Sequence, residues 1–264
     1  DVLMRVLFAT RPYEKKAGSA NELFKKWSAI AMKNIEDGSM RGFNNNIRYI
    51  VKDFDELPLL EIKKPKVGVV GEILVKYHPV ANNDIVGIIE AEGGEAVVLD
   101  LLDFFLYGFY SKEYNFMNLS GSYKSMVINM LYIKVTEWIR SNARKSLDQS
   151  KRFHGPIHIS EMAKKAKKVT SLGNQCGEGW LLTGEMVELL DSGITNIVCL
   201  QPFACLPNHV TGKGMMKSLR KYNPLANIAA IDYDPGASDV NQLNRIKLMM
   251  ATAFKNMDLD TDLC

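Results

Sequence analysis

A strand–helix–strand pattern over Lys66–Asp100 constrains the fold more than any other feature of this chain. Val67–Val70 is a short apolar run typical of a buried strand, and Glu95–Leu99 is a second one. Between them lies a helical pattern that Asn82 or Asn83 can cap and that the glycine pair before Glu95 ends. Two such strands joined by a crossover helix are parallel, and the crossover is right-handed.

The C-terminal part of the chain alternates helix and strand in the same way. Ile194–Leu200 is rich in β-branched residues and predicts a buried parallel strand, which ends at Gln201–Pro202 because proline cannot donate to a ladder. Ile228–Asp232 predicts a further strand. The sequence therefore predicts an α/β fold, with flavodoxin- or Rossmann-like parallel sheet units and helical additions. No GxGxxG follows the first strand and no P-loop motif occurs, which disfavours nucleotide sites of those kinds.

A proline-containing connector, Leu57–Pro65, predicts the main division of the chain. We expect residues 1–65 to be a helical portion that packs on the α/β part. Residues 66–264 are the α/β region, and the pattern also permits its division into two halves, residues 66–150 and 151–264.

Apolar residues at helical spacing predict several helices outside the strand–helix pattern. Ser19 with Glu22 three residues later is a capping-box pattern, and Phe43–Phe54 predicts the next helix. A long helix is expected over Ser125–Leu147. The residues expected to face inward on it are Met126, Met130, Ile133 and Trp138.

Composition narrows the class of protein. The net charge of +3 is too small to indicate a nucleic-acid partner, and no run of eighteen apolar residues predicts a membrane span. Four unevenly spaced cysteines favour reduced thiols in the cytoplasm over a disulfide framework. No signal-peptide pattern is visible, and Asp1 in the first position is expected of a chain cut from a longer one.

The loop Phe203–His209 is the strongest candidate for a site. It follows the predicted strand directly, and sites in open α/β sheets lie at the carboxyl ends of strands. It carries the thiol of Cys205 and the imidazole of His209, and Gln201 and Pro202 stand at the same edge, where a cofactor would bind. As a thiolate, Cys205 is a nucleophile or a metal ligand, whereas a buried thiol there would be only a small apolar side chain.

Other polar residues lie near the predicted strand ends. Glu72 follows the first strand, in a loop expected to reach Pro79, and its carboxylate either binds a ligand or caps a turn. The carboxylate of Glu178 either binds a ligand or, as an acidic residue in the first turn, complements the dipole at the start of the next helix. Cys176 lies in a glycine-rich loop and is open to a ligand role, whereas Cys199 falls inside the strand and is expected in the core. No CxxC pair supports a metal site formed by this segment alone.

Three segments together resemble the 2-hydroxyacyl-CoA dehydratase superfamily, and within it the dehydratase-like region of CoA-substrate-specific enzyme activases. They are VGVVGEILVKYHPVANNDIVGIIEAEGGEAVVLDL, GNQCGEGWLLTGEMVELL and NIVCLQPFACLPNHVTGKGMMKSLR. The similarity runs from roughly Val67 to Phe254.

The resemblance implies a flavodoxin-like architecture and a 4Fe–4S cluster held by a few cysteines. In the family, a partner ATPase activator drives one low-potential electron to this cluster, and water is removed from a 2-hydroxyacyl-CoA. Cys205 matches the C-terminal cluster cysteine, Cys176 is a second ligand, and Glu178, Gln201 and Pro202 border the cofactor. Glu72 and His209 are the candidate catalytic residues, and His209 either donates to a cluster sulfur or ligand or caps the following helix. The family's upstream cysteine motif and ATPase domains are not in this sequence, so other domains of a parent chain would complete the site.

Two alternatives stay open beside this interpretation. The chain can be a non-catalytic domain that binds a CoA thioester or docks a partner, with Glu72, Lys213 and Lys217 as contacts. It can also be a scaffold whose site is vestigial.

Overall fold

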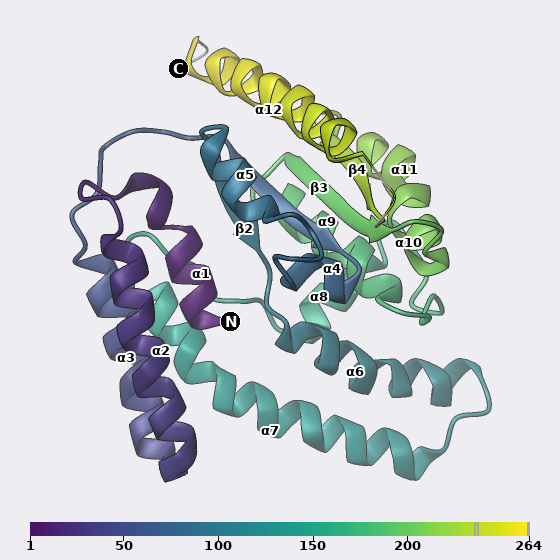
Figure 1. The fold of residues 1–264 in the computed structure, drawn as a ribbon. Coiled ribbons are helices and arrows are strands. Elements are labelled where there is room, and N and C mark those ends of the chain that lie inside the picture. Colours follow the sequence, from purple (N-terminus) through teal and green to yellow (C-terminus); the bar gives the residue numbers. More distant parts are fainter. Residues whose placement is uncertain (235, 237, 263–264) are drawn as a thin grey trace.

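The computed structural model describes residues 1–234, 236 and 238–262, so Cys264 and the proline of the predicted turn at Pro235 lie outside it. Within the described residues, four parallel strands form one sheet in the order β2-β1-β3-β4 (Figure 1). Their bounds are β1 Lys66–Gly71, β2 Glu95–Val98, β3 Asn196–Pro202 and β4 Asn227–Tyr233. The predicted α/β fold is confirmed.

The strand order places a topological switch point in the middle of the sheet. The order matches the first four positions of the flavodoxin order. In that order strands are added first on one side of β1 and then on the other, so the switch point lies between β1 and β3. Residues 66–150 supply β1 and β2, residues 151–264 supply β3 and β4, and β1 pairs with β3. The two halves therefore share one sheet.

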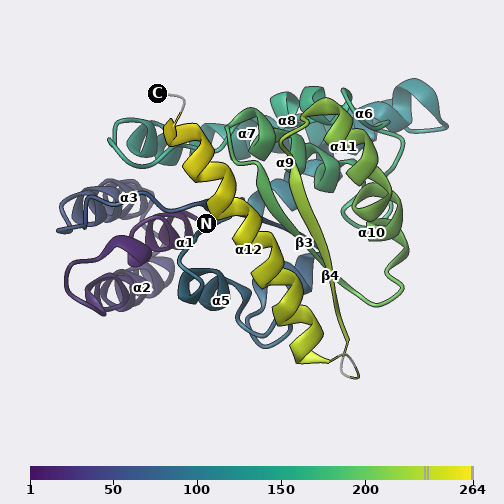
Figure 2. The ribbon, with the colours of Figure 1, turned by 90° about the horizontal axis from the view of Figure 1, so that it is seen from above.

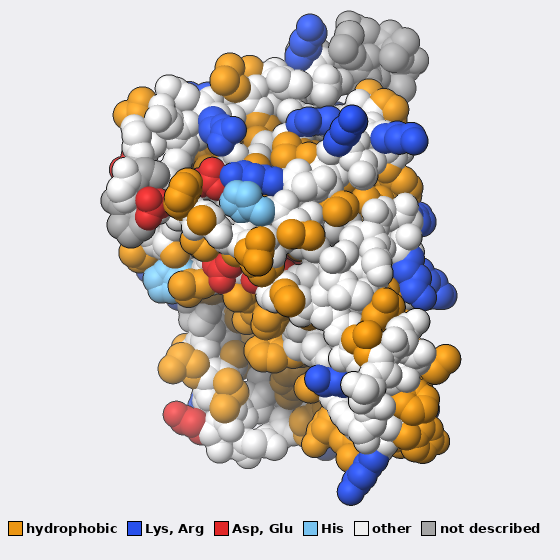
Figure 3. Space-filling view, turned by 90° about the vertical axis from the view of Figure 1, so that its right-hand side faces the viewer, with side chains coloured by type: hydrophobic (Ala, Val, Ile, Leu, Met, Phe, Trp, Pro, Cys, Tyr) orange, Lys and Arg blue, Asp and Glu red, His pale blue; other side chains and the backbone are white. Residues whose placement is uncertain are grey.

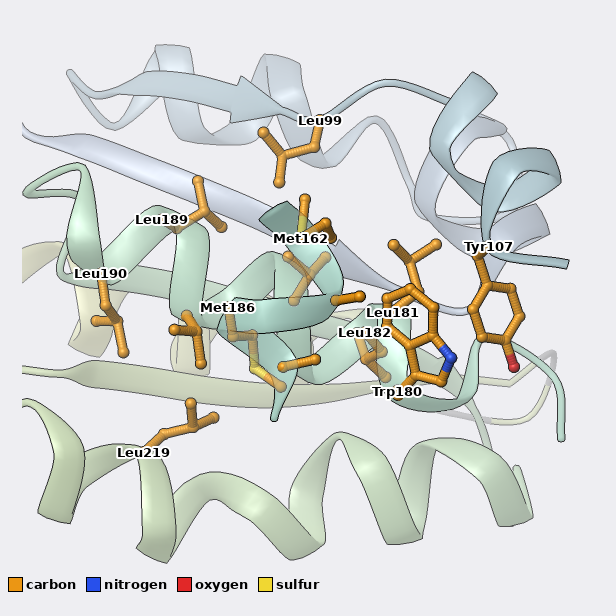
Figure 4. Close-up of a cluster of buried hydrophobic side chains, with 14 of the residues drawn as sticks. Leu99, Tyr107, Met162, Trp180, Leu181, Leu182, Met186, Leu189, Leu190 and Leu219 are labelled. Carbon is orange, nitrogen blue, oxygen red and sulfur yellow. The ribbon is translucent and has the colours of Figure 1, made fainter. Parts of the chain in front are cut away.

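Helices cover both faces of the sheet, as an all-parallel sheet requires (Figure 2). One face packs on α5 (Ile85–Ala91) and α12 (Asp239–Asp262) through a cluster that includes Ile89 and Ile246. The other face packs on α8 (Ile159–Ala166), α9 (Gly179–Asp191) and α11 (Met216–Tyr222). Figure 4 shows the side chains of this second cluster, with Met162, Trp180 and Leu189 among them.

The N-terminal helices form a third cluster. They are α1 (Val2–Phe8), a short helical turn at Arg11–Tyr13, α2 (Ser19–Asp37) and α3 (Met40–Asp55). Their apolar side chains pack together and against Leu147 and Phe153, which lie at the end of the long helix Tyr123–Asp148 and just after it. The connector itself forms no helix or strand.

The predicted cap of α2 is wrong. Ser19 accepts no capping hydrogen bond, and the N-cap residue is Gly18, whose φ of 88° is left-handed. The carboxylate of Glu14 accepts instead, from the backbone N–H of Gly18 at 2.6 Å and of Ala20 at 2.8 Å. Two N–H groups at the start of the helix are thus satisfied by a residue that precedes it.

Helices α6 (Leu102–Asn118) and α7 (Tyr123–Asp148) form an antiparallel hairpin below the sheet (Figure 1). Of the residues predicted to face inward on α7, Ile133 is buried, but Met130 and Trp138 are exposed. The prediction was wrong for these two because α7 lies at the edge of the molecule, where only its α6 side is covered over these turns.

Two segments predicted as loops contain short helices. After β1 the chain forms α4 (Ile73–Tyr77), and after β3 it forms α10 (Leu206–Thr211), in which Pro207 occupies the first turn that suits proline. A helical turn at Lys213–Met215 follows, and α11 starts at Met216. No helix of the described chain has the length and apolar character needed to cross a membrane.

Candidate functional site

The candidate site lies at the switch point, where the chain leaves β1 and β3. These strands are paired, with Gly71 opposite Leu200, and the N–H of Glu72 donates to the carbonyl of Leu200 at 2.8 Å. Gly71 has a φ of 143°, and a Cβ there would overlap the backbone of Leu200. This close approach holds the turn before α4 beside the turn before α10, where ligands bind in open α/β sheets.

Glu178 connects the two turns from a third segment. Its side chain is buried, and its Oε1 accepts from the N–H of Ile73 at 3.0 Å. Its Oε2 accepts from Nδ2 of Asn208 at 3.2 Å. Glu178 precedes α9 but makes no side-chain cap there, so it binds the first turns of α4 and α10 instead. The sequence gave no indication of this, because its partners are 105 and 30 positions away.

Cys205 is the half-buried N-cap residue of α10, and its thiol is not enclosed in the core. Its Sγ accepts from Nδ2 of Asn208 at 3.2 Å. The neighbouring side chains of Phe203 and Leu206 are exposed. N–H donors of this kind orient cysteine sulfurs and tune bound iron–sulfur clusters.

The loop of Cys176 touches the loop of Cys205. Gly177 is left-handed, with a φ of 57°, and a Cβ on it would lie 2.9 Å from Cγ of Pro207. Cys176 itself is exposed. The structure thus brings the two predicted ligand loops into contact.

Cys199 differs from both of these thiols. It is fully buried in the sheet, as predicted, and burial raises the pKa of its thiol to about 12. A thiol with such a pKa stays protonated and does not act as a ligand or nucleophile at neutral pH.

The two predicted catalytic residues lie at or within the short helices that follow β1 and β3. Glu72 is the N-cap of α4, and its carboxylate accepts from the N–H of Val75 at 2.9 Å. Of the two roles predicted for this carboxylate, the structure shows the capping role. His209 is exposed on α10, not in a loop, and its Nδ1 lies 2.8 Å from the carbonyl oxygen of Cys205. This bond orients the imidazole on the same helix turn as the thiol.

Gln201, Pro202 and Lys213 meet at the end of β3. Gln201 is buried, and its Nε2 donates to Asp232 at 2.6 Å. Pro202 is the last residue of β3 and pairs with Tyr233. Lys213 forms an ion pair with Asp232 at 2.7 Å. Burial alone would raise the pKa of Asp232, but the hydrogen bonds from Lys213 and Gln201 outweigh it and lower the pKa.

Sequence reasoning missed several buried polar side chains near these strand ends. Lys76 and Glu185 form a buried ion pair at 2.7 Å, and burial raises the pKa of Glu185 although Lys76 opposes the rise. Tyr107 is buried, and its pKa is raised by burial and then by the nearby charges of Cys176 and Glu178. The sequence did offer one indication of Glu185, since it is a charged residue within the otherwise apolar pattern of α9.

Two acceptor atoms at the site have no hydrogen-bond partner among the described residues. They are Oε1 of Gln201 and Oδ1 of Asn208, both on fully buried side chains. Buried amide oxygens normally accept a hydrogen bond, from protein or from water. This edge of the sheet therefore retains unused capacity for a donor.

Within the described part of the chain, no three His, Cys, Asp or Glu side chains are grouped closely enough to hold a metal ion. Cys176 and Cys205 are the two open thiols of that part. A four-thiolate site would therefore need ligands from elsewhere.

Comparison of the chain with protein-family models, with curated proteins and with solved structures found no match.

Proposed function

We propose that this chain contributes thiolate ligands to a 4Fe–4S cluster of the type that 2-hydroxyacyl-CoA dehydratases and their activases carry, in the cytoplasm. Cys205 is the first ligand and Cys176 the second. The observation that supports the proposal is the position of Cys205, half-open at the switch point of a parallel sheet with an amide N–H on its sulfur.

The residues present fit part of a cluster site. Thiolates are the ligands that iron–sulfur clusters take, and the two open thiols lie on loops that touch. Because a cluster needs more ligands than two, other domains of a parent chain or a partner subunit supply the rest. When bound, the cluster would provide one-electron chemistry at low potential. In this proposal an ATPase activator supplies the electron and a CoA thioester receives it.

The other residues of the site position these thiols. Asn208 donates to the sulfur of Cys205 and to the carboxylate of Glu178, which in turn binds the first turn of α4. The exposed side chains of Phe203 and Leu206 form an apolar border beside the thiol. Such a border limits the access of water once a partner covers it.

The test is anaerobic purification of the protein in its natural full-length form, with iron content and the electron paramagnetic resonance of the reduced state as readouts. Cys205→Ala is expected to abolish the signal and Cys176→Ala to lower iron content. Cys199→Ala is the matched control. Because the thiol of Cys199 is buried, this substitution should leave the iron content unchanged. Equal iron in the protein and in the Cys205→Ala variant would refute the proposal.

The second candidate function is binding of a CoA thioester or docking of a partner without a cluster. The unused acceptors of Gln201 and Asn208 favour it, since a ligand with N–H or O–H groups could donate to them. Calorimetry with an acyl-CoA on iron-free protein separates the two functions, because binding without iron supports this one.

A further inference from the structure

One face of α7 is apolar and exposed. Ile128, Leu131, Val135 and Trp138 expose 43%, 61%, 47% and 73% of their surface. The opposite face carries Ile133, which belongs to the buried cluster shared with α6. In Figure 3, hydrophobic side chains gather at the lower end of the molecule, which α6 and α7 form.

The spacing of these four residues is that of a helix-pairing seam. They follow one another at intervals of three, four and three positions, so they lie in one stripe along the helix. No helix or strand of the described residues covers this stripe over its length. Single exposed apolar residues are common, but a continuous stripe marks an interaction surface.

We propose that the stripe on α7 binds the same stripe on a second copy of this chain, as an antiparallel helix pair about a two-fold axis. The axis passes level with Ile133, so Ile128 lies opposite the partner's Trp138 and Leu131 lies opposite the partner's Val135. Each layer pairs a larger side chain with a smaller one. A surface that complements itself in this way is what a two-fold interface requires.

Exposed charges at the ends of the stripe agree with this pairing. Lys124 lies on the first turn of α7, on the stripe side. The first half of α3 lies on the same side of α7, because Asn142 donates to the carbonyl of Asn44, and the last turn of α2, which precedes α3 directly, exposes Glu36 and Asp37. In an antiparallel pair the partner's Lys124 approaches these carboxylates, and the same contact forms twice.

The exposed apolar area is close to what one partner buries in a standard interface. The four stripe residues with Val127 and Tyr132 beside them, which expose 43% and 57%, present on the order of 700 Å². A stable interface buries roughly 800 Å² on each partner. The stripe faces away from α6, which lies between α7 and the sheet, so the dimer leaves the candidate site open (Figure 1).

Sedimentation equilibrium of the protein over a range of concentrations tests the proposal. We expect a monomer–dimer equilibrium whose dissociation constant rises about 30-fold or more in Leu131→Glu/Val135→Glu. Leu248→Glu is the matched control, because Leu248 exposes 70% on α12 at the other end of the molecule and should leave the equilibrium unchanged. A monomer at all concentrations, or a folded double variant that dimerises like the parent, overturns the proposal.

Disulfide trapping tests the antiparallel arrangement separately. Chains with Ile128→Cys are mixed with chains with Trp138→Cys, both in a Cys176→Ser/Cys205→Ser background. The mixture should form a disulfide-linked dimer, whereas Ile128→Cys alone should not, because its two thiols would lie about 15 Å apart along the helices. Trapping with Ile128→Cys alone would indicate parallel helices and overturn the pairing.

Discussion

At the scale of single residues, Glu178 connects more of the candidate site than any cysteine does. Its carboxylate holds the N–H of Ile73 and the amide of Asn208, and Asn208 in turn donates to the sulfur of Cys205. Both acceptor oxygens are used, and the side chain is buried. A carboxylate in this position joins three segments that are far apart in the sequence.

Glu178→Gln is expected to lower the free energy of unfolding by about 1–3 kcal/mol. The amide that replaces one carboxylate oxygen would face an N–H donor and leave a buried group without a partner. Urea unfolding followed by circular dichroism measures the change. Glu161→Gln is the control, since Glu161 is exposed with an exposed partner in Lys164, and should change stability by less than about 0.5 kcal/mol. Equal stability of the two variants would contradict this role of Glu178.

The sequence located Cys205 but not the residues that hold it. A run of β-branched residues ended by Pro202 was enough to place the thiol at the carboxyl edge of a strand. The partners of Glu178 and Cys205 depend on how three distant segments pack, and one sequence carries no local pattern for such contacts. Glu72 had two roles open for a similar reason, because a carboxylate after a strand can serve a ligand or the next helix equally well.

At the scale of elements, the contact between β1 and β3 fixes the switch point. Gly71 turns the chain beside the carbonyl of Leu200, with a φ that L side chains rarely adopt. The position therefore needs glycine for two reasons, the close approach of the backbone and its conformation.

Gly71→Ala is expected to destabilise the protein by about 3 kcal/mol or more, because the new Cβ would force β1 away from β3. Gly108→Ala is the matched control. Gly108 lies within α6, a Cβ there meets nothing within 4 Å, and alanine should stabilise the helix by about 0.5–1 kcal/mol. Thermal unfolding of both variants gives the comparison. Destabilisation of both by a similar amount would show that the approach of the strands is not the cause.

The strands were easier to predict than the short helices between them. Apolar β-branched runs gave all four strands to within a few residues, since their burial on both faces leaves a continuous pattern. Helices α4 and α10 have five and six residues, too few to show a helical period, and their starts depend on Glu72 and Pro207. Trp138 was predicted to face the core but belongs to the exposed stripe on α7, because periodicity identifies an apolar face but not what covers it.

At the scale of the whole molecule, a buried ionic network connects the N-terminal helices to the sheet. Arg140 on α7 donates to Asp103 on α6 at 2.6 Å and to Asp100 after β2 at 2.7 Å. Arg5 on α1 donates to the same Asp100 at 2.6 Å. Arg144, one turn further along α7, donates to Glu137 at 2.6 Å. These bonds lie between the hydrophobic clusters, so they fix how α1, α6 and α7 sit on the end of β2.

Arg140→Met is expected to lower the free energy of unfolding by about 3–5 kcal/mol at pH 8, because it leaves the buried carboxylate of Asp103 without its cation and leaves Asp100 with Arg5 alone. Burial already raises the pKa of Asp103, and the hydrogen bond from Arg140 opposes that rise. Without the guanidinium the pKa rises further. A carboxyl group with a folded-state pKa above its unfolded value loses stability as the pH increases, so the deficit of the variant should be smaller at pH 5 than at pH 8. Arg48→Met is the control, as Arg48 is exposed on α3 and should cost less than about 0.5 kcal/mol at either pH. Urea unfolding at the two pH values measures both variants, and a deficit for Arg140→Met that does not change with pH would mean that the carboxylates are not what the arginine stabilises.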